Sequence, residues 1–126
     1  EKAIHLCEQA LKVYYEDYPK NQADTQYLLA TIYYERLQGN KAENQDKALS
    51  LLEETLGVYS PEDFPKDWAD VQYWFGVVYR ELVEGDEDVN QNKAIKAFKE
   101  ALVSYGKNKY PEDWALVQYN LAISYR

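Results

Sequence analysis

Hydrophobic positions recur along this chain with the spacing of α-helices, in segments separated by polar residues. Between residues 90 and 105 the apolar side chains lie three or four positions apart, with lysines and a glutamate between them. This spacing predicts an amphipathic helix. The segment 65–84 carries two apolar stripes, which is typical of a helix packed by several neighbours. We therefore expect an all-α protein with no strands and six helices, at approximately 1–16, 20–38, 44–59, 65–84, 90–105 and 111–126.

The helical pattern repeats with a fixed period. The aromatic–proline pairs at 18–19, 64–65 and 110–111 stand 46 residues apart (64 minus 18, 110 minus 64), and the stretches that follow them align without gaps. Related second segments start near Asn44 and Asn90, and the first residues of the chain are a further copy, one residue shorter. A period of this size is typical of stacked two-helix units that cannot bury their apolar faces alone. We expect one domain over 1–126, with complete units at 18–63 and 64–109 and partial units at 1–17 and 110–126.

Turn-forming and capping residues recur with the same period. Gly39 and Gly85 are predicted to close the first helix of each pair in a left-handed conformation. Asn44 and Asn90 are predicted to cap the start of the second helix. The prolines fit the first turn of each new pair, where a missing N–H has little cost; they are Pro19, Pro65 and Pro111.

Small and aromatic residues follow an order that resembles the tetratricopeptide repeat, with its Leu-Gly-x-x-Tyr and Ala-x-x-x-Phe-x-x-Ala elements. Here the two elements read Phe75-Gly76-x-x-Tyr79 and Ala94-x-x-x-Phe98-x-x-Ala101. The chain departs from the family in its longer period, in lacking the closing proline, and in replacing the usual tryptophan by glutamine at 26, 72 and 118. The resemblance implies an α-solenoid of antiparallel helix pairs, wound as a right-handed superhelix. It also implies that the first helices line a concave groove that holds peptide segments of partner proteins.

Candidate groove residues lie on one stripe of the first helices. They combine phenol rings, apolar side chains and guanidinium groups, which suit flat apolar contact and charge-assisted bonds to carboxylates. They are Tyr27, Thr31, Tyr34, Tyr73, Val77, Arg80, Tyr119, Ile123 and Arg126. The same tyrosines at 27, 73 and 119 could instead pack between adjacent first helices, and the sequence leaves both interpretations open.

Other repeated residues are expected to have structural roles or to modify the groove. Tyrosines at 33, 79 and 125 share a stripe with small residues at 30, 76 and 122, which predicts core packing. Trp68 and Trp114 are expected to bridge one helix pair to the next. Carboxylates beside the groove would favour basic groups in the same partner; they are Asp24, Glu35, Asp70 and Glu81.

Composition excludes several kinds of chemistry. The 126 residues carry a net charge of −8, which disfavours nucleic acid as a partner. Cys7 and His5 are the only residues of their kinds, so we expect no disulfide, no metal site and no cofactor. No apolar run approaches the ~20 residues of a membrane-spanning helix, and no secretory signal opens the sequence, so we expect a cytoplasmic protein that is not a membrane partner. The repetition of nearly every notable residue also disfavours an asymmetric catalytic site, so no catalytic residue is proposed and the chain is not expected to be an enzyme.

Three functions remain open. The favoured one is a protein–protein interaction scaffold that binds a partner segment on its concave face. The second is a spacer in a larger signalling or effector protein that binds no peptide. The third is a helical α/α hydrolase that uses Trp74 and nearby acids. The chain starts and stops within helix pairs, so we also expect a longer parent protein and end-to-end self-association of this fragment.

Overall fold

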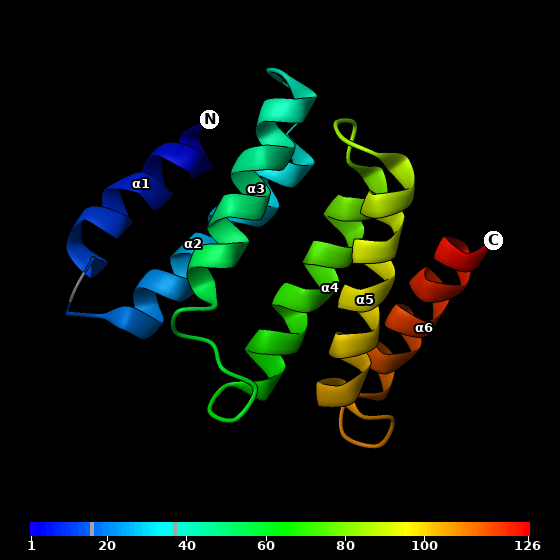
Figure 1. The fold of residues 1–126 in the computed structure, drawn as a ribbon. Helices are drawn as coiled ribbons and strands as arrows, with labels where there is room; N and C mark the ends of the chain where they lie inside the picture. The colour runs from blue at the N-terminus through cyan, green and yellow to red at the C-terminus, as the bar shows by residue number, and fades with distance from the viewer. Residues whose placement is uncertain (16, 37) are drawn as a thin grey trace. The chain divides into compact units, whose positions relative to one another are not determined.

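The computed structural model describes residues 1–15, 17–36 and 38–126. Within these residues it contains six helices and no strand, as the hydrophobic pattern predicted (Figure 1). The helices are α1 (Lys2–Tyr14), α2 (Pro19–Glu35), α3 (Lys41–Thr55), α4 (Pro65–Glu81), α5 (Glu87–Tyr105) and α6 (Pro111–Tyr125).

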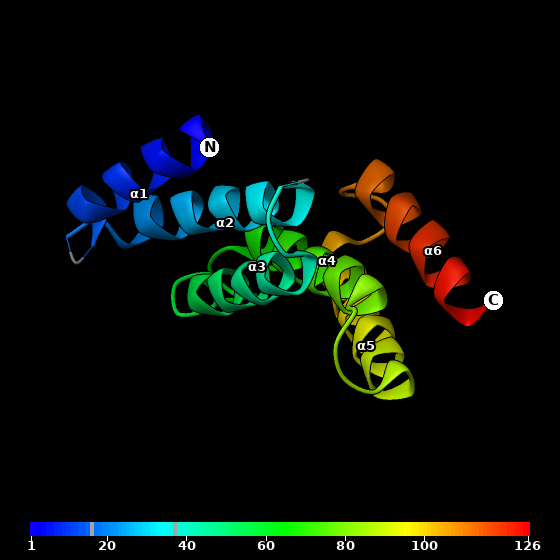
Figure 2. The same cartoon turned by 90° about the horizontal axis from the view of Figure 1, so that it is seen from above.

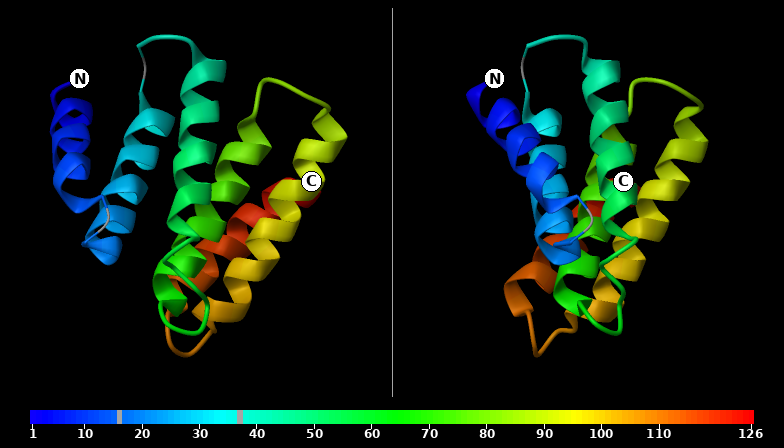
Figure 3. Two further views of the ribbon diagram at one scale, coloured as in Figure 1. Left: turned by 60° about the vertical axis from the view of Figure 1, so that its left-hand side comes forward. Right: turned by 90° about the vertical axis from the view of Figure 1, so that its left-hand side faces the viewer.

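The helices belong to two compact units, Glu1–Tyr59 with α1 to α3 and Ser60–Arg126 with α4 to α6. In the first unit α2 packs against both α1 and α3. In the second unit α5 packs against both α4 and α6, and α4 also touches α6. Consecutive helices of a unit run in opposite directions, as the views from above and from the side show (Figures 2 and 3). The division falls near the expected boundary between residues 63 and 64, and a single domain stays a prediction.

Prolines begin three of the helices at the expected places. Pro19, Pro65 and Pro111 are the first residues of α2, α4 and α6. At this position the proline ring supplies the helical φ and its missing N–H leaves no bond unmade. The aromatic residue before each proline has nearly the same backbone conformation, with φ between −132° and −133°. The local sequence therefore determines where each pair starts.

The starts of α3 and α5 differ from the prediction by three residues. Asn40 and Asp86 are the caps, and their side chains accept hydrogen bonds from the backbone N–H of Glu43 and Val89, both at 3.0 Å. The predicted caps Asn44 and Asn90 are wrong, because both lie inside their helices and are buried. Each donates its Nδ2 back to a carbonyl of the preceding loop, that of Gln38 at 2.9 Å and that of Glu84 at 2.8 Å. Their role is to fix the loop to the helix.

The first helices also end earlier than predicted. α2 and α4 end at Glu35 and Glu81, so Gly39 and Gly85 do not close them. Both glycines are left-handed as expected, with φ of 82° and 85°. They lie in the loop, one residue before the next cap. The expected end of the first segment at residue 16 and residue 37 of the second lie outside the described residues.

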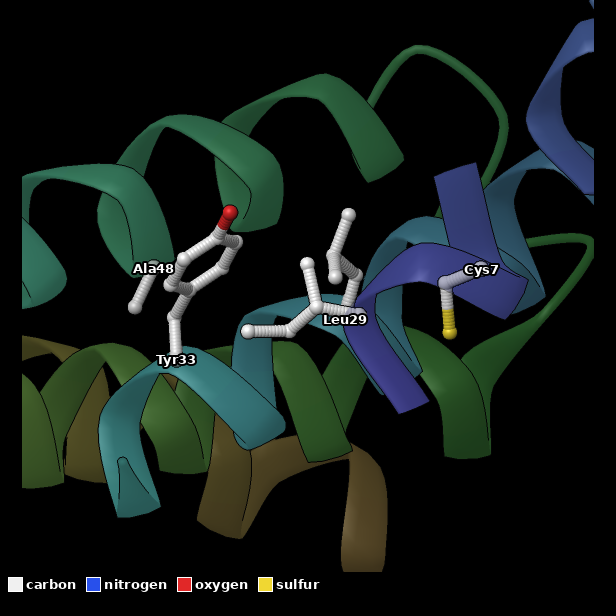
Figure 4. Close-up of a cluster of buried hydrophobic side chains, with 5 residues drawn as sticks. Cys7, Leu29, Tyr33 and Ala48 are labelled. Atoms are coloured by element: carbon white, nitrogen blue, oxygen red, sulfur yellow. The ribbon is translucent and has the colours of Figure 1, made fainter. Parts of the chain in front are cut away.

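The core of the first unit gathers side chains from all three helices. Cys7 of α1, Leu29 and Tyr33 of α2 and Ala48 of α3 are buried together with Ile4 (Figure 4). Burial, followed by the nearby charge of Glu8, raises the pKa of the Cys7 thiol. The free cysteine therefore acts as a small apolar residue of the core.

Close packing in the second unit centres on a glycine. A Cβ built at Gly76 of α4 would lie 2.4 Å from Cε1 of the Phe98 ring on α5. Phe98 is fully buried, so the ring has no open space to move into. The absence of a side chain at position 76 lets the two helices approach, as the sequence predicted for this stripe.

Repeated aromatic positions do not share one environment. Tyr33 is 6% exposed, Tyr79 is half-buried and Tyr125 is 60% exposed. The prediction of a core position is therefore wrong for Tyr125, because this ring stays largely exposed although Lys99 Nζ of α5 lies 5.7 Å from its centre. Trp68 and Trp114 are half-buried, and Lys107 Nζ lies 5.7 Å from the Trp114 ring centre. Their bridging role stays a prediction.

Candidate functional site

Three candidate groove residues lie on α2 of the first unit. Tyr34 packs against the buried cluster around Tyr33, and Tyr27 is half-buried. The Thr31 hydroxyl donates to the carbonyl of Leu28 at 2.8 Å, within its own helix. The structure thus places one member of this stripe against the core and leaves the others part-exposed.

A shallow hollow lies on another face of the first unit. Its volume is about 340 Å³ and its apolar floor is formed by Leu29, Tyr33 and Leu51. Lys47 extends across part of it, with Nζ 5.0 Å from the centre of the Tyr33 ring. Polar residues from α1 and α3 complete the rim; they are Glu8, Asp46 and Ser50. No groove residue predicted from the sequence lines it.

Tyr73 of α4 is the candidate whose ionisation the structure perturbs. Its half-buried ring lies 6.1 Å from that of Phe98 and 5.5 Å from that of Trp74, measured between ring centres. Burial raises the pKa of the phenol, while the charge of Arg80 and a hydrogen bond with Asn120 act in the opposite direction. Tyr73 is therefore a half-buried phenol that packs against Phe98 and Trp74 and keeps its proton to a higher pH than a free tyrosine.

Arg80 connects the same region of α4 to α6. Its Nη1 donates to Oδ1 of Asn120 at 2.8 Å, and its guanidinium carbon lies 5.8 Å from the Phe98 ring centre. Glu81 lies 3.7 Å from Nη2. Asn120 is itself oriented by donating Nδ2 to the carbonyl of Leu116 at 2.9 Å. Tyr73, Arg80 and Asn120 thus join α4 to α6, and we call these three residues the Tyr73–Arg80–Asn120 cluster.

The sequence analysis missed Asn120. It is buried in α6, a helix with apolar residues on most of its surface. Positions 28, 74 and 120 are equivalent in the repeat and hold Leu, Trp and Asn. Asn120 could have been identified by this change from an apolar residue to an amide at an equivalent position of an otherwise regular repeat.

The remaining candidates differ in accessibility. Val77 is buried and Ile123 is half-buried, whereas Tyr119 and Arg126 are exposed. In the second unit Tyr119 and Arg126 are therefore the exposed candidates. The part-buried Tyr73 and Arg80 belong to the cluster that joins α4 to α6.

Two of the carboxylates expected to attract basic partner groups are already engaged. Tyr59 donates to Asp24, and Lys20 Nζ lies 2.7 Å from the same carboxylate. The second unit repeats this arrangement 46 residues later, where Tyr105 and Lys66 contact Asp70. We call these the Lys–Asp–Tyr triads. Internal cations thus take the place that the sequence analysis assigned to a partner.

The Lys66 ammonium illustrates the electrostatics of a triad. Partial burial alone would lower its pKa, but the hydrogen bond to Asp70 and the charges of Asp70, Asp113 and Asp67 together raise it. The lysine is therefore held in its charged form over the tyrosine ring, with Nζ 5.8 Å from the centre of Tyr105.

The described part of the chain holds no group of three or more His, Cys, Asp or Glu side chains that could hold a metal ion. No helix among the described residues is long and apolar enough to cross a membrane. No family model matches the chain, and neither the curated proteins nor the solved structures contain one similar enough to count as a match.

Proposed function

We propose that this chain is a module of helical repeats, similar in plan to tetratricopeptide repeats, which binds a segment of a partner protein on the surface of its first helices. The proposal includes the finer arrangement, an α-solenoid of antiparallel pairs. The observation that supports it is the recurrence of the same contacts 46 residues apart. The Lys–Asp–Tyr triads, the buried asparagine bonds to the preceding loop, and the lysines over Tyr33 and Tyr79 all recur in this way.

Contacts that recur in both units stabilise the helix packing. Exposed residues of the first helices that take no part in them are free to differ from one repeat to the next. Tyr119 offers an exposed ring, and Arg126 lies two turns further along the same helix side. Arg80 donates to Asn120 and pairs with Glu81 at 3.7 Å, and the five N–H donors of its guanidinium group still leave some for a partner. An arginine that is already oriented binds a carboxylate with little additional loss of entropy.

The surface favours a partner segment that carries a carboxylate next to an aromatic or large apolar side chain. The carboxylate would contact Arg80 or Arg126, and the apolar group would lie on Tyr119 and the accessible edge of Tyr73. Basic groups of a partner would gain less binding free energy than the sequence suggested, because Asp70 already pairs with Lys66 and accepts a hydrogen bond from Tyr105. This is the chemistry that a binding screen should vary.

The experiment selects binders for the whole chain from a peptide library in which acidic and aromatic positions are varied, and then measures affinity by calorimetry. We expect Tyr119→Ala to weaken binding about tenfold or more, with an unchanged melting temperature. Tyr15→Ala is the matched control, since Tyr15 is equally exposed in the other unit. Equal losses in both variants would contradict a site on α6.

A spacer that binds no peptide is the second candidate. It is favoured by one observation, that Tyr73 and Arg80 are already engaged with Phe98 and Asn120. A library that yields no binder, together with a large loss of stability in Tyr73→Ala, would support the spacer over the binding module.

A further inference from the structure

The face of α6 that corresponds to the covered faces of α2 and α4 is exposed. In α2 this stripe consists of Ala23, Gln26, Ala30 and Tyr33, all of which are buried. In α4 the equivalent residues at 69, 72 and 76 are buried and Tyr79 is half-buried. In α6 every member is exposed; they are Ala115, Gln118, Ala122 and Tyr125. Equivalent residues are therefore covered by other helices in α2 and α4 but exposed in α6.

The covering element in both units is the second helix of the same pair. In the first unit, Gln26 donates to Glu54 of α3 at 2.8 Å, and Lys47 of α3 lies over Tyr33. In the second unit, Gly76 faces Phe98 of α5, and Lys93 of α5 lies 5.3 Å from the Tyr79 ring centre. The uncovered face of α6 is thus shaped for a helix of the type of α3 and α5.

α1 is a helix of this type, and it has the complementary uncovered face. Its exposed or half-buried apolar residues follow one stripe; they are Ala3, Leu6, Ala10 and Val13. Ala3 and Ala10 align with positions 48 and 55 of α3 and with 94 and 101 of α5, all of which are buried. In α1 Ala3 is exposed and Ala10 is half-buried, unlike their equivalents.

We propose that α1 of a second copy of this chain docks on the exposed face of α6, so that copies associate head to tail. The individual residues match the contacts within the units. Lys2 is equivalent to Lys47 and Lys93, and would lie over the part of the other copy's Tyr125 ring that Lys99 of that copy leaves exposed. Gln9 is equivalent to Glu54, and its amide can pair with Gln118. Two unlike faces meet in this contact, so it leaves one face of each kind open for further copies.

One position of the proposed contact does not match its equivalents inside the units. Tyr14 is equivalent to Tyr59 and Tyr105, which donate to the carboxylates of the triads. On α6 the positions of the triad lysine and aspartate hold Glu112 and Leu116, so the aspartate that accepts from the tyrosine in each triad is missing there. The intermolecular contact is therefore expected to be weaker than the contacts inside each unit.

The test uses two variants that each block one face. Ala122→Glu places a carboxylate on the α6 face, and Ala3→Glu places one on the α1 face; both positions are exposed, so the fold is not disturbed. In sedimentation velocity the wild-type chain should form oligomers that grow with concentration, whereas each variant alone should be monomeric. An equimolar mixture of the two variants should form a dimer, because each retains the face that the other lacks.

Controls and contrary outcomes follow from the same design. Val103→Glu, at a position that is 84% exposed on α5, should associate like the wild type. The double variant Glu112→Lys, Leu116→Asp recreates the triad positions and should tighten association about tenfold. A wild-type chain that stays monomeric at about 1 mM, a mixture that stays monomeric, or self-association of Ala3→Glu alone would overturn the proposal. Peptide binding is measured on Ala3→Glu, which leaves α6 unchanged, so a loss of peptide binding there would count against the proposed function and not against the association.

Discussion

Gly76 lies inside α4 where that helix meets Phe98, and replacing it with alanine tests how closely the second unit is packed. In an ordinary helix interior, Gly→Ala stabilises by about 1 kcal/mol, because glycine loses more backbone entropy on folding. Here the new methyl group would lie 2.4 Å from the ring, a contact that requires the ring or a helix to shift. Overpacking costs about 1–3 kcal/mol, and a contact this short belongs to the upper part of that range, about 2–3 kcal/mol. We expect a net loss of about 1–2 kcal/mol, with a melting temperature lower by about 3–8 °C.

The first unit supplies the compensating change. Its equivalent positions hold Ala30 and Leu52, both buried (76 minus 46, 98 minus 46). Phe98→Leu alone should cost about 1–2 kcal/mol, because it leaves a void beside Gly76. In the double variant the methyl group fills this void, so stability should return to within about 1 kcal/mol of the wild type. The two substitutions should therefore show a coupling energy of about 2 kcal/mol.

The assay is urea unfolding followed by circular dichroism, with the free energy of unfolding extrapolated to water for the four members of the cycle. Gly57→Ala is the control, since Gly57 is exposed and its added Cβ would lie 3.4 Å from the carbonyl of Glu54. It should change stability by less than about 0.5 kcal/mol. A neutral or stabilising Gly76→Ala, or additive effects in the double variant, would refute the argument from packing.

Two further predictions concern tyrosines. Because the pKa of Tyr73 is raised from 10.0, the stability it contributes is present below that pH and is lost as the pH rises through the folded-state pKa. Tyr73→Phe should therefore reduce the loss of stability that occurs above pH 10.0 in urea titrations, while Tyr119→Phe should not. Removing the Tyr105 hydroxyl with Tyr105→Phe should cost about 1–2 kcal/mol through the lost bond to Asp70. Tyr125→Phe is its exposed control, and equal effects of the two would argue against the triad.

Local features of this protein could be read from the sequence alone. The spacing of apolar residues indicated six helices, and the prolines at 19, 65 and 111 marked three starts that the structure confirms. Gly39 and Gly85 were expected to be left-handed, and they are. These features depend on φ preferences and on periodicity over one or two turns, which a short stretch of residues carries by itself.

The residue that caps each second helix could not be chosen from the local sequence, because two good capping residues lie one turn apart. Asn40 and Asn44 are both good caps one turn apart, as are Asp86 and Asn90. The loops close only when the inner asparagines turn back to the carbonyls of Gln38 and Glu84, and this leaves the outer residues as caps. The sequence holds both solutions, and the closure of the loop selects one.

In the candidate site, too, the sequence predicted the local pattern but not the contacts between helices. Its tyrosine and arginine residues were recognised as a stripe, but the pairing of Arg80 with Asn120 was not, since it joins residues 40 positions apart on separate helices. Likewise, Asp24 and Asp70 were recognised as carboxylates, but not as acceptors for Tyr59 and Tyr105. The sequence by itself determined the helices and their repeated faces, because these follow from local geometry. Only the tertiary structure decided which face of each helix is covered, because burial depends on a neighbour that distant residues supply.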